Sequence, residues 1–251
     1  MSFFYATVII AVFIAIVLIV RAKAARAARL RERQLWIGIS RDIAHQFGTP
    51  LSALMGWLDL LPTAKSVESI LPEMQRDLER LRTILNRLSQ VSGPTRFVSV
   101  DLRQMTSDLS SYFQKRLPSG ERGVVISVEV AGDPMAVGQP DLLSWALEHL
   151  IKNAADALDG RAGKIILRAR EEGECVVIQI EDSGRGIPAK LRSKIFAPGF
   201  TTKNGGRGLG LALVALIIED LHHGAVSIKE CAVGKGTTIS ILLPKAGQAP
   251  V

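Results

Sequence analysis

The chain has 251 residues, of which 47% are hydrophobic and only 5% aromatic, and its net charge is +7. This hydrophobic share and modest net charge exclude a disordered chain and indicate globular domains with aliphatic cores. Two cysteines, Cys175 and Cys231, lie far apart without the spacing of a metal site, which favours reduced thiols over a structural disulfide.

The first twenty residues carry no charge, and residues 21–33 hold six Lys or Arg against one Glu. An uncharged stretch of this length predicts a transmembrane helix over residues 1–20 in contact with the lipid bilayer, followed by a basic juxtamembrane helix over 21–35. A cleaved signal peptide would have its basic residues before the apolar run. The positive-inside rule predicts a single-pass protein of the inner membrane, its N-terminus outside without room for an external sensing domain and its catalytic region in the cytoplasm. The membrane span accounts for the basic run, so we expect no nucleic-acid partner.

Two heptad patterns follow, within residues 36–93. Leucines recur from Leu51 to Leu61 with spacings of three and four, and the pattern resumes from Leu71 to Leu88 after the interruption "PTAKS" at 62–66. Two such helices form an antiparallel hairpin whose apolar seam is only half covered. The sequence therefore predicts an all-α hairpin that dimerises into a four-helix bundle, and hence a homodimer.

His45 lies on the first of these helices, one residue past the seam position Ala44. Its imidazole should therefore reach solvent beside the core. Taken alone, the pattern favours an ordinary exposed histidine, and a helix built to present it for chemistry is the other interpretation.

From residue 97 to 245 the pattern changes to strands that alternate with helices. We expect strands near 124–130, 164–170, 175–181, 225–230 and 237–243, and helices near 102–116, 140–158 and 208–222. This order predicts an α+β two-layer sandwich, with the helices on one face of a mixed sheet.

Three segments of this part are unusual. "DSGRGIP" at 182–188 follows a strand directly, and "KNGGRGLGL" at 203–211 runs into an apolar helix. Glycines allow backbone N–H groups to approach a phosphate, although each cluster alone is equally compatible with a plain turn. The helix 140–158 is mostly apolar but carries Glu148, Lys152, Asn153 and Asp156, and an asparagine oxygen is suited to Mg²⁺, although Asn153 could equally be a polar surface residue.

The motifs "NAADAL", "DSGRGIP", "FAPGFTTK", "GGRGLGL" and "GKGTT" occur in that order. Together they resemble the ATP-binding domain shared by histidine kinases, gyrase, heat-shock chaperones and mismatch-repair ATPases, which has a Bergerat-type fold. The preceding hairpin, with His-x-x-x-Thr-Pro-Leu on its first helix, makes residues 36–245 similar to a bacterial sensor histidine kinase of a two-component system. The resemblance reverses the first interpretation of His45 and implies a phosphoacceptor.

The resemblance implies an ATP site between the asparagine helix and the glycine loops. Asn153 would bind Mg²⁺, Asp182 would accept a hydrogen bond from the adenine amino group, and Thr237 would lie near the base. Gly184 and Gly186 would turn beside the base, Gly206, Gly208 and Gly210 would close over the phosphates, and Phe196, Phe200 and Lys203 would belong to a lid. The remaining expected nucleotide-binding residues are Glu148, Lys152, Asp156, Ile187, Thr201, Thr202 and Leu209.

The resemblance also implies that His45 attacks the γ-phosphate of ATP and that the phosphoryl group then passes to an aspartate of a response-regulator receiver domain. The family usually has Glu or Asp after the histidine, and this chain has Gln46, which cannot accept the ring proton; Asp42 could partly substitute. His149 stands where the family usually has Asn. Thr49 matches the family residue that positions water to hydrolyse the regulator's phospho-aspartate, which implies phosphatase activity as well.

Two other functions remain open from the sequence. Gln46 and His149 would fit an ATP-binding pseudokinase that acts as a scaffold, or a regulator biased toward phosphatase activity. A chaperone-like or repair-type ATPase is disfavoured by the His-x-x-x-Thr-Pro hairpin.

Overall fold

The computed structural model describes residues 40, 43–44, 46–61, 67–92, 97–117, 123–203 and 208–247. The expected membrane helix 1–20 and basic helix 21–35 lie outside these residues, as do Asp42, His45 and Gly206. Within the described part of the chain, no helix is both long and apolar enough to cross a membrane.

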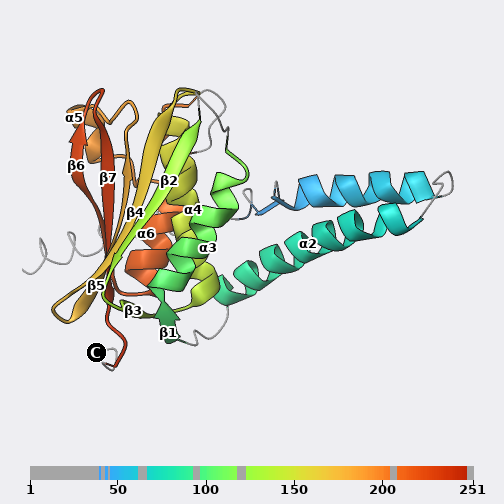
Figure 1. Ribbon diagram of the computed structural model, residues 1–251, viewed down its shortest axis with the longest axis horizontal. Coiled ribbons are helices and arrows are strands. Elements are labelled where there is room, and N and C mark those ends of the chain that lie inside the picture. Colours follow the sequence, from blue (N-terminus) through green and yellow to red (C-terminus); the bar gives the residue numbers. More distant parts are fainter. Residues whose placement is uncertain are drawn as a thin grey trace, which may run out of the picture.

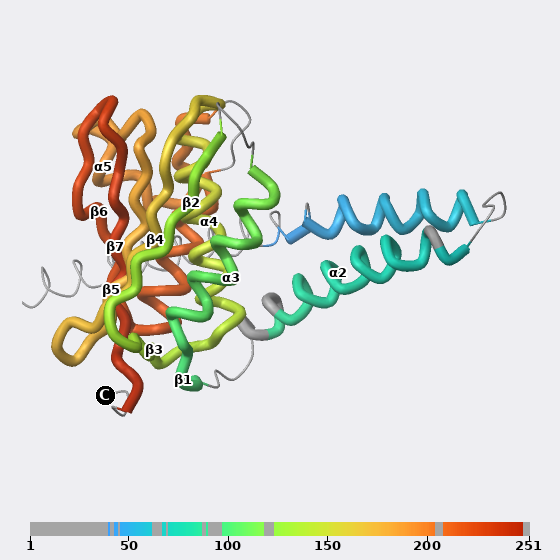
Figure 2. Tube along the Cα trace, viewed as in Figure 1, coloured from blue at the N-terminus to red at the C-terminus, as the bar shows by residue number. Residues whose placement is uncertain are grey.

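Two helices form the expected hairpin. The first is helical over residues 46–60, and the second, α2, spans Leu71–Ser92 after the short 3-10 turn η2 at Val67–Ser69. Figure 2 shows the two helices running side by side and projecting from the rest of the molecule. The indole N–H of Trp57 on the first helix donates a hydrogen bond of 3.1 Å to the buried carboxylate of Asp77 on α2. This bond fixes the two helices relative to one another.

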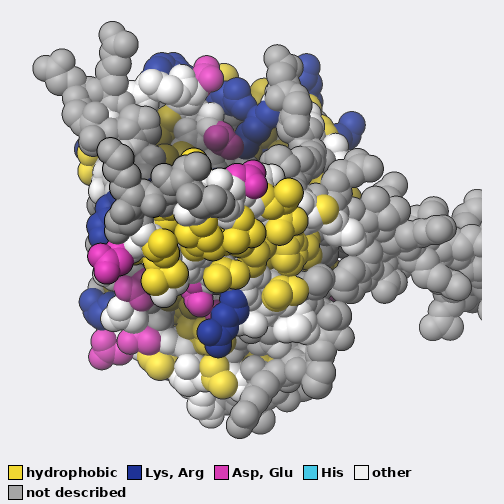
Figure 3. All heavy atoms as spheres, turned by 90° about the vertical axis from the view of Figure 1, so that its right-hand side faces the viewer, with side chains coloured by type: hydrophobic (Ala, Val, Ile, Leu, Met, Phe, Trp, Pro, Cys, Tyr) yellow, Lys and Arg dark blue, Asp and Glu magenta, His cyan; other side chains and the backbone are white. Residues whose placement is uncertain are grey.

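One side of the hairpin exposes a row of large apolar side chains at heptad spacing. Leu58, Leu78 and Leu85 are each more than half exposed, as are Leu51 and Met55. Figure 3, turned so that the side from which the hairpin projects faces the viewer, shows hydrophobic side chains gathered across the middle of this view. These positions belong to the seam that the heptad pattern predicts.

The rest of the chain folds as the expected α+β two-layer sandwich. A five-stranded sheet has the order β2-β4-β5-β7-β6, from the strands Val124–Ala131, Gly163–Glu172, Cys175–Asp182, Gly236–Pro244 and Ala225–Ala232. The β2–β4 pair is parallel and the other pairs are antiparallel, so the predicted mixed sheet is confirmed. The helices α3 (Leu102–Gln114), α4 (Pro140–Ala157) and α6 (Gly210–Ala215) cover one face (Figure 1).

Four elements were not predicted. β1 (Val98–Asp101) and β3 (Met135–Gly138) form a separate antiparallel pair, and α5 (Ala189–Arg192) is one short turn. The expected helix 208–222 divides into α6 and a π-helical segment, η3, at Leu216–Leu221. The ring of His222 explains where this segment ends, because its Nδ1 lies 2.6 Å from the carbonyl oxygen of Ile217.

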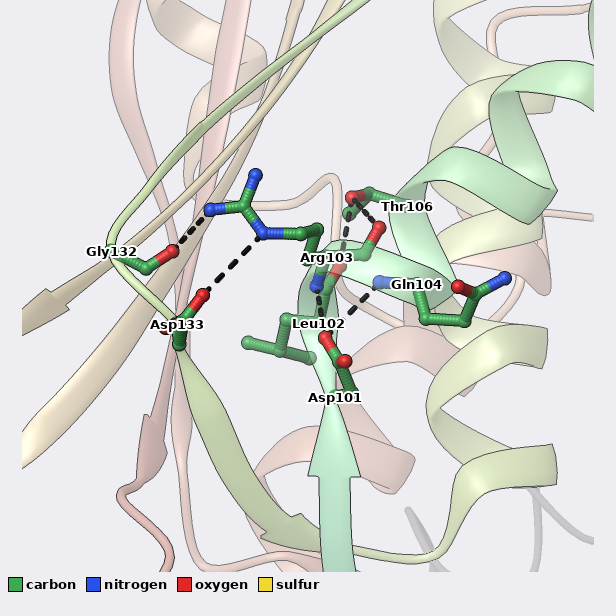
Figure 4. A network of polar contacts seen from close by, with 7 residues as sticks. All are labelled: Asp101, Leu102, Arg103, Gln104, Thr106, Gly132 and Asp133. Atoms are coloured by element: carbon green, nitrogen blue, oxygen red, sulfur yellow. Dashed lines mark hydrogen bonds and ion pairs between the residues drawn. The ribbon is translucent and has the colours of Figure 1, made fainter.

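A polar network holds the start of α3 (Figure 4). The carboxylate of Asp101 accepts hydrogen bonds from the backbone N–H groups of Arg103, at 2.8 Å, and Gln104, at 3.1 Å, and so caps the helix. The guanidinium of Arg103 bonds the carbonyl of Gly132 and pairs with Asp133 at 3.6 Å. The connection that enters this part of the chain is thereby fixed to the turn between β2 and β3.

The core lies between the sheet and α4. The inner face of α4 is entirely buried, with Leu142, Leu143, Trp145, Ala146, Leu147, Leu150, Ile151 and Ala154. Ile43 and Ile84, one from each side of the hairpin, belong to the same cluster of buried apolar residues, and α2 contacts α4. The outer side of α4 is left for polar residues, and these face a cavity.

Candidate functional site

A cavity of about 790 Å³ lies beside α4, bounded by β5, β7, the turn after β5 and the segment that leads into α6. The side chains of His149, Lys152, Asn153 and Asp156 enter its lining from α4. Their spacing of three and four residues places them on one side of the helix, opposite the buried leucines. The amphipathic pattern of α4 thus positions the polar part of the site.

The strand ends supply the opposite wall. Asp182 at the end of β5 pairs in register with Thr237 of β7, and Ile180 pairs with Ile239. Because side chains two residues apart share a face of a strand, the two isoleucines continue the wall that the aspartate and threonine begin. All four residues line the cavity, which therefore has an apolar surface next to a carboxylate.

The carboxylate of Asp182 is buried and held by the backbone. It accepts a 2.8 Å hydrogen bond from the N–H of Gly184. Burial raises the pKa of Asp182 above its ordinary range, although the N–H groups of Gly184 and Thr237 favour the charged form. Such a carboxylate is a fixed acceptor for an N–H donor inside an otherwise apolar pocket.

Glycines make the close approaches around α4 possible. A Cβ at Gly184 would lie 2.6 Å from the carbonyl oxygen of Ala157, and the N–H of Arg185 bonds the same oxygen at 3.0 Å. At the other end, a Cβ at Gly210 would lie 3.2 Å from Nδ1 of His149. The site therefore extends along α4 from His149 to Ala157, about 12 Å at the rise of an α-helix.

Gly208 shapes the strand-like segment that faces α4. Its φ is +66°, and a Cβ there would lie 2.4 Å from the carbonyl carbon of Gly199. The N–H of Gly199 bonds the carbonyl of Gly208 at 3.0 Å, so the two ends of this loop lie against one another. Phe200, Thr201, Thr202 and Lys203 follow directly, and all four line the cavity.

Most of the residues expected at a nucleotide site lie together in this lining. These are Lys152, Asn153, Asp156, Asp182, Gly186, Ile187, Phe200, Thr201, Thr202, Lys203, Gly208, Leu209, Gly210 and Thr237. Three others do not line the cavity: Glu148 pairs with Lys152 at 3.9 Å, Gly184 packs on α4, and Phe196 packs against the core. On the hairpin, Gln46 is half-buried and Thr49 is exposed.

The apolar lining was missed by sequence reasoning. Ile180 and Ile239 could have been found from strand alternation, because each lies two residues from an expected site residue on the same face. The lining also includes Leu150, Ala154, Ala157, Arg185, Pro188, Leu191, Ile195, Leu211 and Val233. Leu191 and Ile195 follow the motif "DSGRGIP" without any periodicity that would mark them.

Two family models match the chain. Residues 138–247 match the "Histidine kinase-, DNA gyrase B-, and HSP90-like ATPase" family, and residues 38–93 match the "His Kinase A (phospho-acceptor) domain" family. The first range contains the whole cavity lining, and the second contains the hairpin and His45.

Curated relatives match across both parts. The sensor histidine kinase ZraS of Escherichia coli K12 is 31% identical over 223 residues, which are 85% of this chain and 47% of that protein. Sporulation kinase A of Bacillus subtilis is 30% identical over 213 residues, 82% of this chain and 34% of that protein. The chain thus spans about half, or less, of the length of these relatives.

Solved structures show the same fold. The nucleotide-free catalytic domain of the histidine kinase ThkA superposes with a TM-score of 0.54 and 28% identity, over 60% of this chain and 96% of that one. ThkA in complex with the response regulator protein TrrA gives a TM-score of 0.54 with 24% identity, over 87% of this chain and 65% of that one.

Proposed function

This chain belongs to the two-component sensor histidine kinases, and from that premise we propose that it transfers the γ-phosphoryl group of ATP to His45 and then to an aspartate of a response regulator. The observation that carries the proposal is the single cavity that brings together Asn153, Asp182 and Gly208. These three come from parts of the chain as much as 55 residues apart, and each stands in a different motif of the ATPase family.

The chemistry of the lining supports ATP as the ligand. A purine fits an apolar wall such as Ile180 and Ile239, and its amino group can donate to the fixed carboxylate of Asp182. A triphosphate fits the polar side of α4, where Lys152 and Lys203 are cations and the glycine loop lets backbone N–H groups approach. These residues would bind and orient the nucleotide.

The residues also suit Mg²⁺. In this structure the ammonium of Lys203 lies between Oδ1 of Asn153 and Oδ2 of Asp156, so the two oxygens already accommodate one cation. Within the described residues no cluster of three or more His, Cys, Asp or Glu could hold a metal by itself. Few protein ligands are what Mg²⁺ needs when nucleotide phosphates complete its shell. Bound there, Mg²⁺ would neutralise charge that develops on the phosphates.

The transfer itself is an in-line displacement. A nitrogen of the neutral imidazole of His45 would bond the γ-phosphorus as the bond to the β-γ bridging oxygen breaks, ADP would leave, and the ring would release its proton. Asp42 is the carboxylate nearest in sequence that could take this proton, and Gln46 can only orient the ring. The phosphohistidine would then pass its phosphoryl group to the regulator.

We further propose that the chain acts as a membrane-anchored homodimer. The exposed apolar row on the hairpin, including Leu58, Leu78 and Leu85, supports a second copy as the partner that completes a four-helix bundle. The uncharged residues 1–20 and the basic run after them support a single span of the inner membrane with the kinase in the cytoplasm.

A second candidate function is favoured by Gln46 and His149. An amide after His45 and an imidazole in the cavity lining both depart from the family pattern, which fits a phosphatase-biased regulator or an ATP-binding scaffold without efficient autokinase activity. Thr49, exposed on the hairpin, would support the phosphatase reaction.

A transfer experiment separates these functions. The full chain is incubated with Mg²⁺ and γ-labelled ATP, freed of nucleotide, and mixed with a receiver domain. A kinase becomes labelled and then loses label to the receiver, but not to a receiver whose acceptor aspartate is replaced by Asn. A phosphatase-biased regulator or scaffold stays unlabelled, and only the phosphatase accelerates loss of phosphate from a receiver that was phosphorylated chemically.

A further inference from the structure

Lys203 makes two contacts to α4 across the cavity. Its Nζ donates to Oδ1 of Asn153 at 3.0 Å and to Oδ2 of Asp156 at 2.5 Å. The two acceptors lie three residues apart on one side of the helix, whereas Lys203 comes from a segment about fifty residues later. An ammonium group is therefore bound by the amide oxygen that is expected to hold the metal.

The backbone around Lys203 is itself fixed on one side. The N–H of Lys203 donates to Oγ1 of Thr201 at 3.1 Å, and the N–H of Phe200 bonds the carbonyl of Ala197 at 3.2 Å. The ion pair with Asp156 joins this segment to α4. Breaking that ion pair would release the side chain of Lys203 without disturbing the turn behind it.

We propose that Lys203 is a resident counter-cation that Mg²⁺ must displace from Asn153, and that Asp156 anchors it there. The inference rests on the proposed function, because it takes Mg²⁺ with a bound nucleotide as the competitor. Two cations on one amide oxygen repel one another, and Mg²⁺ requires its oxygens at about 2.0–2.1 Å in near-octahedral geometry. The ammonium therefore has to leave before the metal can bind.

This competition regulates the site. Metal-free protein keeps Lys203 on Asn153 and Asp156, and the segment 200–203 stays joined to α4. Binding of the Mg²⁺–nucleotide complex frees the lysine, so that metal entry and release of the segment occur together. The Mg²⁺ concentration that the chain needs is then set partly by the strength of the Lys203–Asp156 pair.

The test measures the Mg²⁺ requirement of nucleotide binding. A fluorescent ADP analogue is held at fixed concentration, Mg²⁺ is titrated, and the midpoint is compared between the parent and Lys203→Met. We expect the midpoint to fall by about two- to fivefold in the variant, the size expected for the loss of a partly exposed ion pair. Lys203→Arg, which keeps the charge, should stay near the parent.

Two control variants separate displacement from a general change in charge. Lys152→Met removes a cation that lines the same cavity but pairs with Glu148, and Lys229→Met removes an exposed lysine of β6 outside the lining. Neither should lower the midpoint as much as Lys203→Met. Thermal melts of all variants establish that they are folded.

Asp156 provides an independent check. Asp156→Ala should lower the midpoint as Lys203→Met does, and the double variant should lower it no further, because both changes remove one contact. An unchanged or higher midpoint in Lys203→Met overturns the proposal, and a higher midpoint in Asp156→Ala overturns the anchor by making Asp156 a metal ligand. A parent that binds no analogue at any Mg²⁺ concentration rejects the proposed function, and the inference with it.

Discussion

The carboxylate of Asp182 accepts a 2.8 Å hydrogen bond from the backbone N–H of Gly184, two residues further along the chain. This bond turns the chain sharply at the end of β5 and fixes the carboxylate in the cavity wall, where burial leaves it few competing partners.

Asp182→Asn should therefore weaken nucleotide binding by about tenfold or more, because a hydrogen bond to a charged acceptor contributes about 1.5–3 kcal/mol. The affinity is measured with a fluorescent ADP analogue. Glu181→Gln is the matched control, since the neighbouring carboxylate pairs with Arg168 and does not line the cavity. Equal affinities for the parent and Asp182→Asn would contradict the assignment.

Gly186 and Gly234 offer a second comparison. Both have positive φ, at 69° and 77°, but a Cβ at Gly186 would lie 2.1 Å from the carbonyl oxygen of Ala232, whereas Gly234 has open space. Gly234→Ala should cost only the left-handed backbone, about 1–2 kcal/mol. Gly186→Ala should cost more and also weaken nucleotide binding. Chemical denaturation and nucleotide titration measure the two effects, and similar losses in both variants would refute the steric explanation.

Gln46 follows the proposed phosphoacceptor directly. Gln46→Glu supplies a carboxylate that can take the imidazole proton, so the initial rate of autophosphorylation should rise, by about tenfold or more if proton removal limits it. Gln46→Met, of similar size but without a base, should not raise the rate. If the rate of Gln46→Glu is unchanged or lower, the missing base does not limit the reaction.

His222 makes stability depend on pH. Its Nε2 accepts the N–H of Gln139 at 3.0 Å, which requires a neutral ring, and burial lowers the pKa of His222. Between this lowered pKa and the ordinary histidine value of about 6.5, the unfolded chain binds more protons than the folded one. The free energy of unfolding should therefore fall as pH drops from above about 6.5 through this window.

Denaturant melts across this pH range test the effect. The parent should lose more stability on acidification than His222→Gln, whose side chain does not titrate. His223→Asn, which changes the exposed neighbour, should follow the parent. Parallel curves for the parent and His222→Gln would show that another group causes the dependence.

The sequence predicted the elements whose patterns are long. Five strands with clear apolar runs and the helix 140–158 lie where expected, within a few residues. β1 and β3 were missed because four residues are too few for a period to appear, and their pairing depends on contacts between distant segments. The π-helical turns of η3 were missed because they depend on the contact between His222 and Ile217 and not on composition.

The site was predictable where a motif carried it. Asn153, Asp182 and Gly208 follow from the motifs, and strand alternation could have added Ile180 and Ile239. The contact between Lys203 and Asp156 was beyond prediction, because it depends on how closely a loop approaches a helix almost fifty residues earlier. Only the folded chain shows that these oppositely charged groups meet inside the cavity.

The central claim is that the cavity delivers a phosphoryl group to His45. Its most direct test follows label from γ-labelled ATP and Mg²⁺ into the full chain and into His45→Ala, with nucleotide affinity measured on the same preparations. The account predicts equal affinities and label on the parent alone, lost in acid and stable in base. Bound nucleotide without any label on the parent, or equal labelling of His45→Ala, would contradict it.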